Sequence, residues 1–391
     1  MPPTLKRFAA LLLGFFALYA LTAQRGLGWG DSGEFQHRIL HLGDGLVSGC
    51  DSFATAHPLY VAFAKFFCST PFQITLVSAF FGALAVAGFY GCTGSVAGSV
   101  LFGLSHAVWW LSCVSEVYTM SLAFLALEMY LLRKFVQNDR RWGMALFFVN
   151  GLHLALHNIA LLSIPVYGVM LLVRLRGLSG RERISAVCLT ALAWAAGASY
   201  WLYSLCSRGA ADVLFGGYGA QTFGFMPARW QVAAFNWALS GISLFVPVCL
   251  LVKAVRRHGF SAAGGEMPMR WAFGALFAVH FAFWVRYFIV SQFTFVLPPL
   301  LLLWLFVSTW GLQVKKWEAW AGIQVLLPVI AYLVLSGMQV PEWRRSLHPH
   351  RDEAAYFALP WKFNDDSADR AAAEYGGVWN GYPDYGRGGA K

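Results

Sequence analysis

The sequence is dominated by apolar stretches of about 20 residues that are separated by short polar breaks. Hydrophobic residues make up 58% of the 391 residues and charged residues only 12%, whereas a soluble domain contains about 45–50% apolar and about 25% charged residues. The hydrocarbon core of a bilayer is about 30 Å thick, and an α-helix needs about 20 apolar residues to cross it. The sequence therefore predicts an all-α, polytopic membrane protein.

Basic residues occur in short clusters between the apolar stretches. The net charge of +10 is therefore typical of topology signals in cytoplasmic loops and does not indicate a nucleic-acid partner. If all clusters are cytoplasmic, an even number of crossings separates each pair. The clusters are Lys6-Arg7, Arg133-Lys134 with Arg140-Arg141, Arg174 to Arg183, Lys253 to His258 with Arg270, and Lys315-Lys316.

About eleven crossings satisfy this parity. It requires that the segment from Pro58 to Cys68 lies in the membrane interface, and that residues 143–173 form two short helices or a re-entrant hairpin turning near His157. The N-terminus is then cytoplasmic. The expected spans are 8–25, 73–91, 96–113, 117–134, 143–156, 158–173, 184–206, 231–252, 271–286, 291–313 and 317–337.

The same count divides the chain into two parts. Residues 1–340 form the expected transmembrane domain, and residues 341–391 form a short extracytoplasmic tail. Residues 25–72 form the first outer loop, and residues 208–230 another outer segment. Lipids are the expected surroundings of most of the chain.

Two carboxylates, Asp31 and Glu34, directly follow the first helix in the segment Gly30-Asp31-Ser32-Gly33-Glu34. If a helix begins at Ser32, they share a face near its N-terminus. A carboxylate beside apolar walls has a raised proton affinity, which suits a general base. The alternative is that Asp31 only caps the helix.

Metal binding is one interpretation of the residues that follow. His37 and His41 continue the face of Glu34, so these three side chains could hold a divalent metal; simple solvation of the histidines is the alternative. The seven cysteines are scattered without CxxC spacing. They indicate neither a disulfide framework nor a zinc site.

Three further groups of polar residues fall on the expected outer face. Glu116 lies between two apolar segments, where an ionisable side chain is a functional candidate. His153 and His157, four residues apart and beside Asn158, project together as a site or as inter-helix hydrogen-bonding groups. Arg286 either snorkels in an aromatic belt or binds a lipid phosphate with its guanidinium.

These residues lie in four ordered motifs that resemble a known family. The motifs are Gly30-Asp31-Ser32-Gly33-Glu34-Phe35, Ala56-His57-Pro58-Leu59-Tyr60, Ser115-Glu116-Val117-Tyr118-Thr119, and Gly151-Leu152-His153 through His157-Asn158. In order and spacing they resemble the protein O-mannosyltransferase-like membrane family of the GT-C glycosyltransferase superfamily, whose first outer loop carries a GDSGEL…AHPPGYPLY signature.

The resemblance implies a GT-C-like fold and a transferase that uses a polyprenyl-phosphate-linked sugar, mannose-like, and an acceptor protein or glycan. Asp31 is then the general base, and Glu34 and Glu116 shape the catalytic site. Arg286 is inferred from depth and charge to neutralise the donor phosphate. The remaining expected substrate-binding residues are His57, Tyr118, His153, His157 and Asn158. No cofactor besides the lipid-linked donor is implied.

Two alternatives stay open at this point. The family's AHPPGYPLY is shortened here to AHPLY, so an inactive family member is one of them. A lipid or solute transporter or flippase is the other. Such a protein places ionisable residues near the bilayer midplane on broken, symmetry-related helices, whereas here the acidic residues gather at one face and no repeat is evident.

Overall fold

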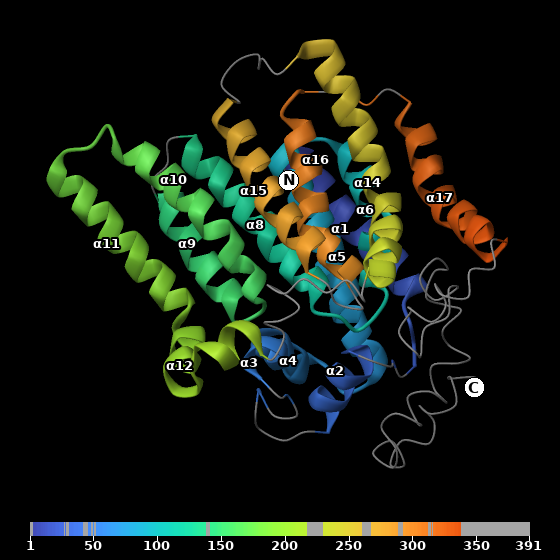
Figure 1. Cartoon of the computed structure of the whole chain (residues 1–391), viewed down its shortest axis with the longest axis horizontal. Coiled ribbons are helices and arrows are strands. Elements are labelled where there is room, and N and C mark those ends of the chain that lie inside the picture. Colours follow the sequence, from blue (N-terminus) through green and yellow to red (C-terminus); the bar gives the residue numbers. More distant parts are fainter. Residues whose placement is uncertain are drawn as a thin grey trace.

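The computed structural model describes residues 3–26, 28, 31–41, 46–47, 50, 52–137, 141–216, 230–259, 267–287, 292–311, 314 and 316–337. Within these ranges every regular element is a helix, which confirms the all-α fold (Figure 1). The expected extracytoplasmic tail, 341–391, lies outside the described residues.

Long helices form the body of the molecule. α5 (Pro71–Thr93) packs between α1 (Pro3–Thr22) and α8 (Tyr118–Val136), and α16 (Leu297–Ser308) packs against α15 (Met267–Arg286), α14 (Trp230–His258) and α8. α17 (Trp317–Gly337) covers α14 and α6 (Val96–Gly103). The centre of the bundle is filled by aliphatic and aromatic side chains from all of these helices.

The described helices are long and apolar enough for an integral membrane protein. Four stretches meet the length and hydropathy needed to cross a bilayer by themselves, and a bent pair of helices adds a fifth. They are Thr4–Thr22, Pro71–Thr93, Asn158–Leu175 and Asn236–His258. The number of eleven crossings stays a prediction.

Two expected spans are not continuous helices. The span 96–113 is broken into α6 and α7 (His106–Ser112), and the carbonyl of Gly103 beside the break accepts a hydrogen bond from Tyr19 Oη at 2.7 Å. Side chains can thus satisfy the backbone groups that a broken helix leaves open inside a bilayer. The span 184–206 consists of α11 (Gly180–Gly197) and α12 (Ser199–Arg208), bent by 70°.

The structure bears on two other expectations about the chain path. α9 (Arg141–Leu154) and the 3-10 helix η1 (Asn158–Ser163), continued by α10 (Ile164–Leu175), form a hairpin that turns at His157. α4 (Pro58–Phe67) has ten residues and is therefore about 15 Å long, half of what a crossing needs. Its position in the membrane interface stays a prediction.

The glycine of the Gly151-Leu152-His153 motif has a packing role. A Cβ atom at Gly151 would lie 2.3 Å from the carbonyl oxygen of Trp194, and one at Gly197 would lie 2.1 Å from that of Phe148. α9 and α11 therefore cross backbone against backbone. Small residues allow such close crossings between membrane helices.

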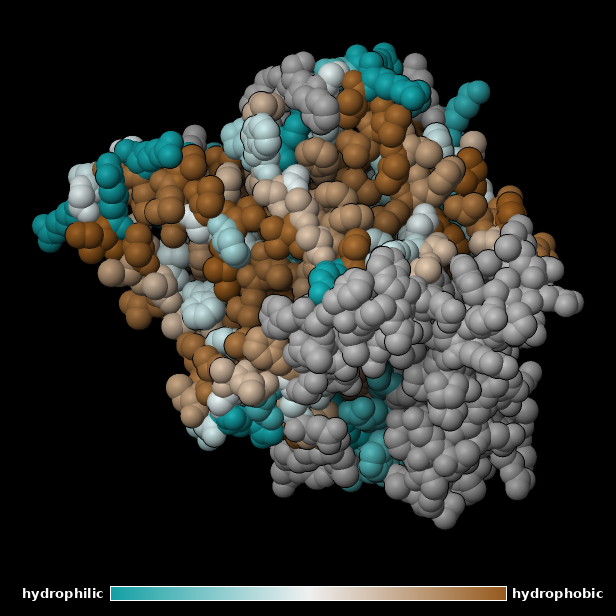
Figure 2. Space-filling model, in the orientation of Figure 1, coloured by the Kyte–Doolittle hydropathy of each residue, from teal (hydrophilic) through white to brown (hydrophobic). Residues whose placement is uncertain are grey.

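Three short helices that follow α1 gather at one end of the bundle. α2 (Asp31–Leu40), α3 (Phe53–Ala56) and α4 lie together at the bottom of the view in Figure 1, whereas the α10–α11 connection, the end of α14 and the start of α15 lie at the top. Hydrophobic residues cover the region between the two ends, and hydrophilic residues concentrate at the ends (Figure 2). This distribution is the one expected of a bundle that spans a bilayer.

Candidate active site

The helix α2 is held against the junction between α7 and α8 by two polar contacts. Ser32 Oγ donates a hydrogen bond to Glu116 Oε1 at 3.3 Å, and Gln36 Nε2 donates to Ser115 Oγ at 3.0 Å. Gln36 is fully buried, and its Oε1 accepts a hydrogen bond from Gly28 N at 2.7 Å. The first and third motifs, 84 residues apart, therefore form one structural unit.

Glu116 is the buried carboxylate of this unit. Its side chain is 2% exposed, and the Ser78 hydroxyl of α5 fixes its backbone by accepting from Glu116 N at 3.0 Å and donating to Glu116 O at 2.9 Å. Asp31, the first residue of α2, is exposed. The buried carboxylate, expected at Asp31, is thus found at Glu116.

Asp31 and Glu116 nevertheless have a common neighbour. Both carboxylates lie close enough to Tyr118 for their charges to act on its hydroxyl. Tyr118 begins α8, two residues after Glu116. The structure therefore brings together Asp31, Glu116 and Tyr118 at the end of the bundle where α2 lies.

Glu34 contacts a buried arginine that the motif analysis missed. The Glu34 carboxylate lies 3.7 Å from the guanidinium of Arg38 and accepts a hydrogen bond from Cys50 Sγ at 3.3 Å. Burial raises the pKa of Cys50 to about 12, so the thiol stays protonated and can donate. Arg38 is 1% exposed and donates to the carbonyl of Ala56 at 2.7 Å.

The consequence is that Arg38 ties α2 to the chain just before His57. A signal was available in the sequence, because Arg38 follows Glu34 by four residues and a helix brings such a pair together. Glu34 has a described role in holding this loop, and its expected catalytic role stays a prediction.

His57 occupies a tight turn between α3 and α4. Its backbone is left-handed, with φ 49° and ψ 53°, and its Nδ1 hydrogen-bonds the carbonyl of Leu156 at 2.7 Å. The next backbone contact, from Leu59 N to Ala155 O at 3.0 Å, continues this attachment to the α9–η1 turn. Burial lowers the pKa of His57 to about 4, so the ring is neutral and Nε2 is left as an acceptor.

Aromatic rings continue from His57 across the end of the bundle. The centroids of His57 and His157 are 5.0 Å apart, and those of His157 and Tyr118 are 5.8 Å apart. Phe295 follows, 5.2 Å from Tyr118 and 5.0 Å from Tyr287. We call these five residues the aromatic row. Its rings come from the α3–α4 turn, the α9–η1 turn, α8, η4 (Gln292–Val296) and the end of α15.

Arg286 lies beside this row. It is the last residue of α15 and immediately precedes Tyr287, and its side chain is half-buried. The structure thus places Arg286, which is expected to bind phosphate, at the same end of the bundle as the aromatic row.

His153 does not join His157 in the row. Its Nδ1 lies 2.7 Å from Glu128 Oε1 and its Nε2 lies 2.7 Å from Ser121 Oγ, so both ring nitrogens are occupied. Glu128 Oε2 accepts a second hydrogen bond, from Tyr167 Oη at 2.6 Å. The two histidines that were expected to project together are separated, and His153 has the inter-helix role that was its alternative.

Asn158 also makes contacts with other helices. Its Nδ2 donates to the carbonyl of Val213 at 2.6 Å, and its Oδ1 accepts from Trp201 Nε1 at 2.9 Å. Val213 belongs to a short π-helix, η2 (Ala211–Phe215), in which Asp212 accepts a hydrogen bond from Phe53 N at 3.1 Å. Asn158 therefore helps to fasten η2 over α3, and its expected substrate contact stays a prediction.

The arrangement of the histidines of α2 does not favour a metal. The rings of His37 and His41 stack with centroids 5.6 Å apart, while Glu34 turns to Arg38 and Cys50. In the described part of the chain no three histidine, cysteine or acidic side chains lie close enough to share a metal ion. Glu34, His37 and His41 therefore do not form the ligand set that their spacing allowed.

Comparisons with known proteins agree with this architecture. Residues 90–179 match the family model for the protein O-mannosyl-transferase TMEM260 N-terminal domain. This segment contains Glu116, Tyr118 and the α9–η1 hairpin, and it begins after α2. No curated protein matches the sequence.

Two solved structures have the same fold. ArnT from Cupriavidus metallidurans bound to undecaprenyl phosphate aligns with a TM-score of 0.56 and 16% identity, and its apo state aligns with a TM-score of 0.52 and 17% identity. Each alignment covers 97% of this chain and 73% of the ArnT chain.

The chain therefore has the fold of the ArnT structures and is an integral membrane protein. The segment that matches the TMEM260 N-terminal domain contains two of the four motifs, Ser115 to Thr119 and Gly151 to Asn158.

Proposed function

We propose that the protein transfers a mannose-like sugar from a polyprenyl-phosphate donor to a hydroxyl group of an acceptor protein or glycan at the outer membrane face, with Asp31 as the general base. The observation that supports this most strongly is the hydrogen bond from Ser32 to Glu116. It holds the first turn of α2, which carries Asp31, against Glu116.

The acceptor half of the reaction uses the exposed carboxylate of Asp31. Because Asp31 lies on the first turn of α2 and is exposed, an acceptor hydroxyl can approach it from the aqueous side. Asp31 takes the hydroxyl proton while the acceptor oxygen bonds to the anomeric carbon of the sugar. The bond between that carbon and the phosphate oxygen breaks, and polyprenyl phosphate leaves with the electron pair.

The donor half uses the cationic and aromatic side of the site. Arg286 lies next to Tyr287 at the end of the aromatic row, where its guanidinium can pair with the donor phosphate and with the charge that develops there. The fold accommodates such a lipid in a relative, since ArnT is recorded with bound undecaprenyl phosphate. Glu116 shapes the site by holding Ser32.

A transporter remains the rival from another class, because the structure contains an ionisable pair in the interior of the bundle. Glu128 is fully buried and His153 is 1% exposed. Buried ionisable residues of membrane helices often belong to ion or proton pathways. Here their hydrogen bonds are made with each other and with Ser121, Tyr167 and Asn150, which favours a structural role.

A transfer assay tests the proposal. Purified protein in liposomes is incubated with radiolabelled polyprenyl-phosphate mannose and other polyprenyl-phosphate sugars, together with acceptor peptides and glycans. We expect a labelled product with the mannose donor, and no loss on adding a chelator. Absence of product with every donor and acceptor, together with movement of labelled lipid or solute across the membrane, would support the transporter instead.

A further inference from the structure

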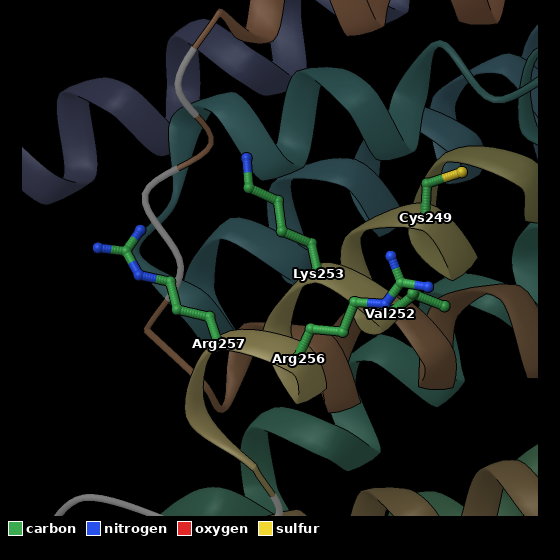
Figure 3. A pocket seen from close by; sticks show the side chains of 5 residues that line it. All are labelled: Cys249, Val252, Lys253, Arg256 and Arg257. Carbon is green, nitrogen blue, oxygen red and sulfur yellow. The ribbon is translucent and has the colours of Figure 1, made fainter.

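Basic hollows occur at the end of the bundle opposite α2. One of them, about 400 Å³, is lined by Cys249, Val252, Lys253, Arg256 and Arg257, all from the last turns of α14. Its three cationic side chains spread in different directions from this single helix (Figure 3). It therefore provides positive charge without walls that enclose a ligand.

The second hollow is larger and lies between four helices. Its volume is about 620 Å³, and its lining comes from the end of α8, the start of α9, the end of α10 and the start of α11. Its apolar walls are formed by Phe135, Met144, Leu171, Leu175, Leu178, Ala186 and Leu189. A cavity of this size and lining suits an apolar chain.

The polar lining of this second hollow contains two arginines and one acid, besides hydroxyl groups. Arg174 is half-buried and Arg181 is exposed, and within the described residues neither guanidinium has a hydrogen-bond or ion-pair partner. The acid in the lining, Glu182, is engaged in its own helix, because its Oε2 accepts hydrogen bonds from Ser179 N at 2.9 Å and Ser179 Oγ at 2.8 Å. The N-terminus of α11 adds the positive end of a helix dipole.

The surroundings of the hollow indicate where its ligand comes from. Large apolar side chains on α10 and α11 are exposed beside it: Leu172 is 63% exposed, Leu189 49% and Leu192 66%. In a protein that spans a bilayer, such a surface faces lipid. The hollow is thus open to membrane lipids, with its arginines at the level where the helices end.

We propose that this hollow binds an anionic phospholipid. One acyl chain lies along the wall formed by Leu171, Leu175 and Leu189, and the phosphate lies between Arg174 and Arg181. Basic pockets between membrane helices recognise anionic headgroups in this way. The site is separate from the candidate active site, which lies at the opposite end of the bundle (Figure 1).

Native mass spectrometry of the full-length protein in detergent tests this proposal. The protein is titrated with dioleoyl phosphatidylglycerol, dioleoyl phosphatidylcholine or inorganic phosphate. The test variant is Arg174→Gln with Arg181→Gln, and the matched control is Arg256→Gln with Arg257→Gln, which removes the same charge from the α14 hollow. A third variant, Ala186→Phe, fills the apolar cavity and leaves both arginines in place.

We expect phosphatidylglycerol to bind to the wild type and to the α14 control with equal affinity. Its affinity falls at least about tenfold in the Arg174/Arg181 variant, since a charge-assisted hydrogen bond accounts for about that factor, and it falls also in Ala186→Phe. Phosphatidylcholine binds weakly to all of them. A thermal melt of each variant shows that its fold is retained.

Several results would overturn the proposal. If the Arg174/Arg181 variant and the Arg256/Arg257 control lost the same affinity for phosphatidylglycerol, the lipid would be attracted nonspecifically to surface charge. Undiminished binding by Ala186→Phe would show that no acyl chain enters the hollow. Displacement of phosphatidylglycerol by millimolar inorganic phosphate would assign the arginines to a free anion.

Discussion

Replacing Glu128 by alanine should destabilise the protein strongly, because this carboxylate joins three helices in the bundle interior. Glu128 of α8 accepts hydrogen bonds from His153 and Asn150 of α9 and from Tyr167 of α10, at 2.7, 3.3 and 2.6 Å. All four side chains are at most 1% exposed. Removing the carboxylate leaves their polar atoms without this acceptor, away from water.

Two estimates give the size of the stability loss expected for Glu128→Ala. Hydrogen bonds between membrane helices average about 0.6 kcal/mol each, so the three bonds give a lower value of about 2 kcal/mol. Removing one partner of a buried ionic pair costs about 3–5 kcal/mol in soluble proteins. We therefore expect Glu128→Ala to lower the free energy of unfolding by about 2–5 kcal/mol.

Unfolding of the purified protein in mixed micelles by increasing sodium dodecyl sulfate measures this change. Glu318→Ala is the control, because Glu318 is an exposed carboxylate of α17 and should change stability by less than about 0.5 kcal/mol. Tyr167→Phe, which removes one bond, should lie between the two. Equal stabilities of Glu128→Ala and the wild type would refute the reasoning.

Two other predictions concern packing and pH. Gly197→Ala should lower the free energy of unfolding by about 1–3 kcal/mol, because the new Cβ atom would lie 2.1 Å from the carbonyl oxygen of Phe148. Gly168→Ala is the control in the same unfolding assay and should be neutral, because a Cβ atom at that position has nothing within 4 Å. Burial holds the pKa of His57 at about 4 in the folded protein, whereas in the unfolded chain the pKa is about 6.5. As the pH drops from about 6.5 to about 4, the unfolded chain is protonated at this histidine and the folded protein is not, so the free energy of unfolding falls over this range. His57→Asn, which tolerates the left-handed backbone, should lose less stability over this range; an unchanged pH profile would contradict the assignment.

The helical architecture was predictable because apolar length and basic clusters are local properties of the sequence. The hairpin turning at His157 followed from the parity of crossings, and its helices lie where they were expected. The bend between α11 and α12 was not predictable. The apolar stretch continues through it, and only the structure shows that the helix direction changes there by 70°.

The candidate site was predictable to the extent that its residues are members of motifs. The sequence placed Asp31, Glu116 and Tyr118 at one face, and the structure brings them together. The sequence did not show that Glu116 is buried and Asp31 exposed. The exposure of these two carboxylates depends on how Ser32 and Gln36 attach α2 to the rest of the bundle.

The separation of His153 from His157 could not be read from the sequence either. Residues four apart share a face only while the helix continues, and α9 ends at Leu154, between them. The partner that holds His153, Glu128, lies within an apolar stretch of α8. Its importance depends on contacts with α9 and α10, which no local pattern encodes.

The proposed sugar transfer depends most on Asp31 acting as a base at the end of the bundle that carries Glu116 and the aromatic row. The most direct test is the turnover rate of purified Asp31→Asn at saturating labelled donor, with donor binding measured separately and Glu318→Gln as the control. We expect the rate to fall about 100- to 10,000-fold while donor affinity and the fold are unchanged. Turnover at the rate of the wild type would contradict the account.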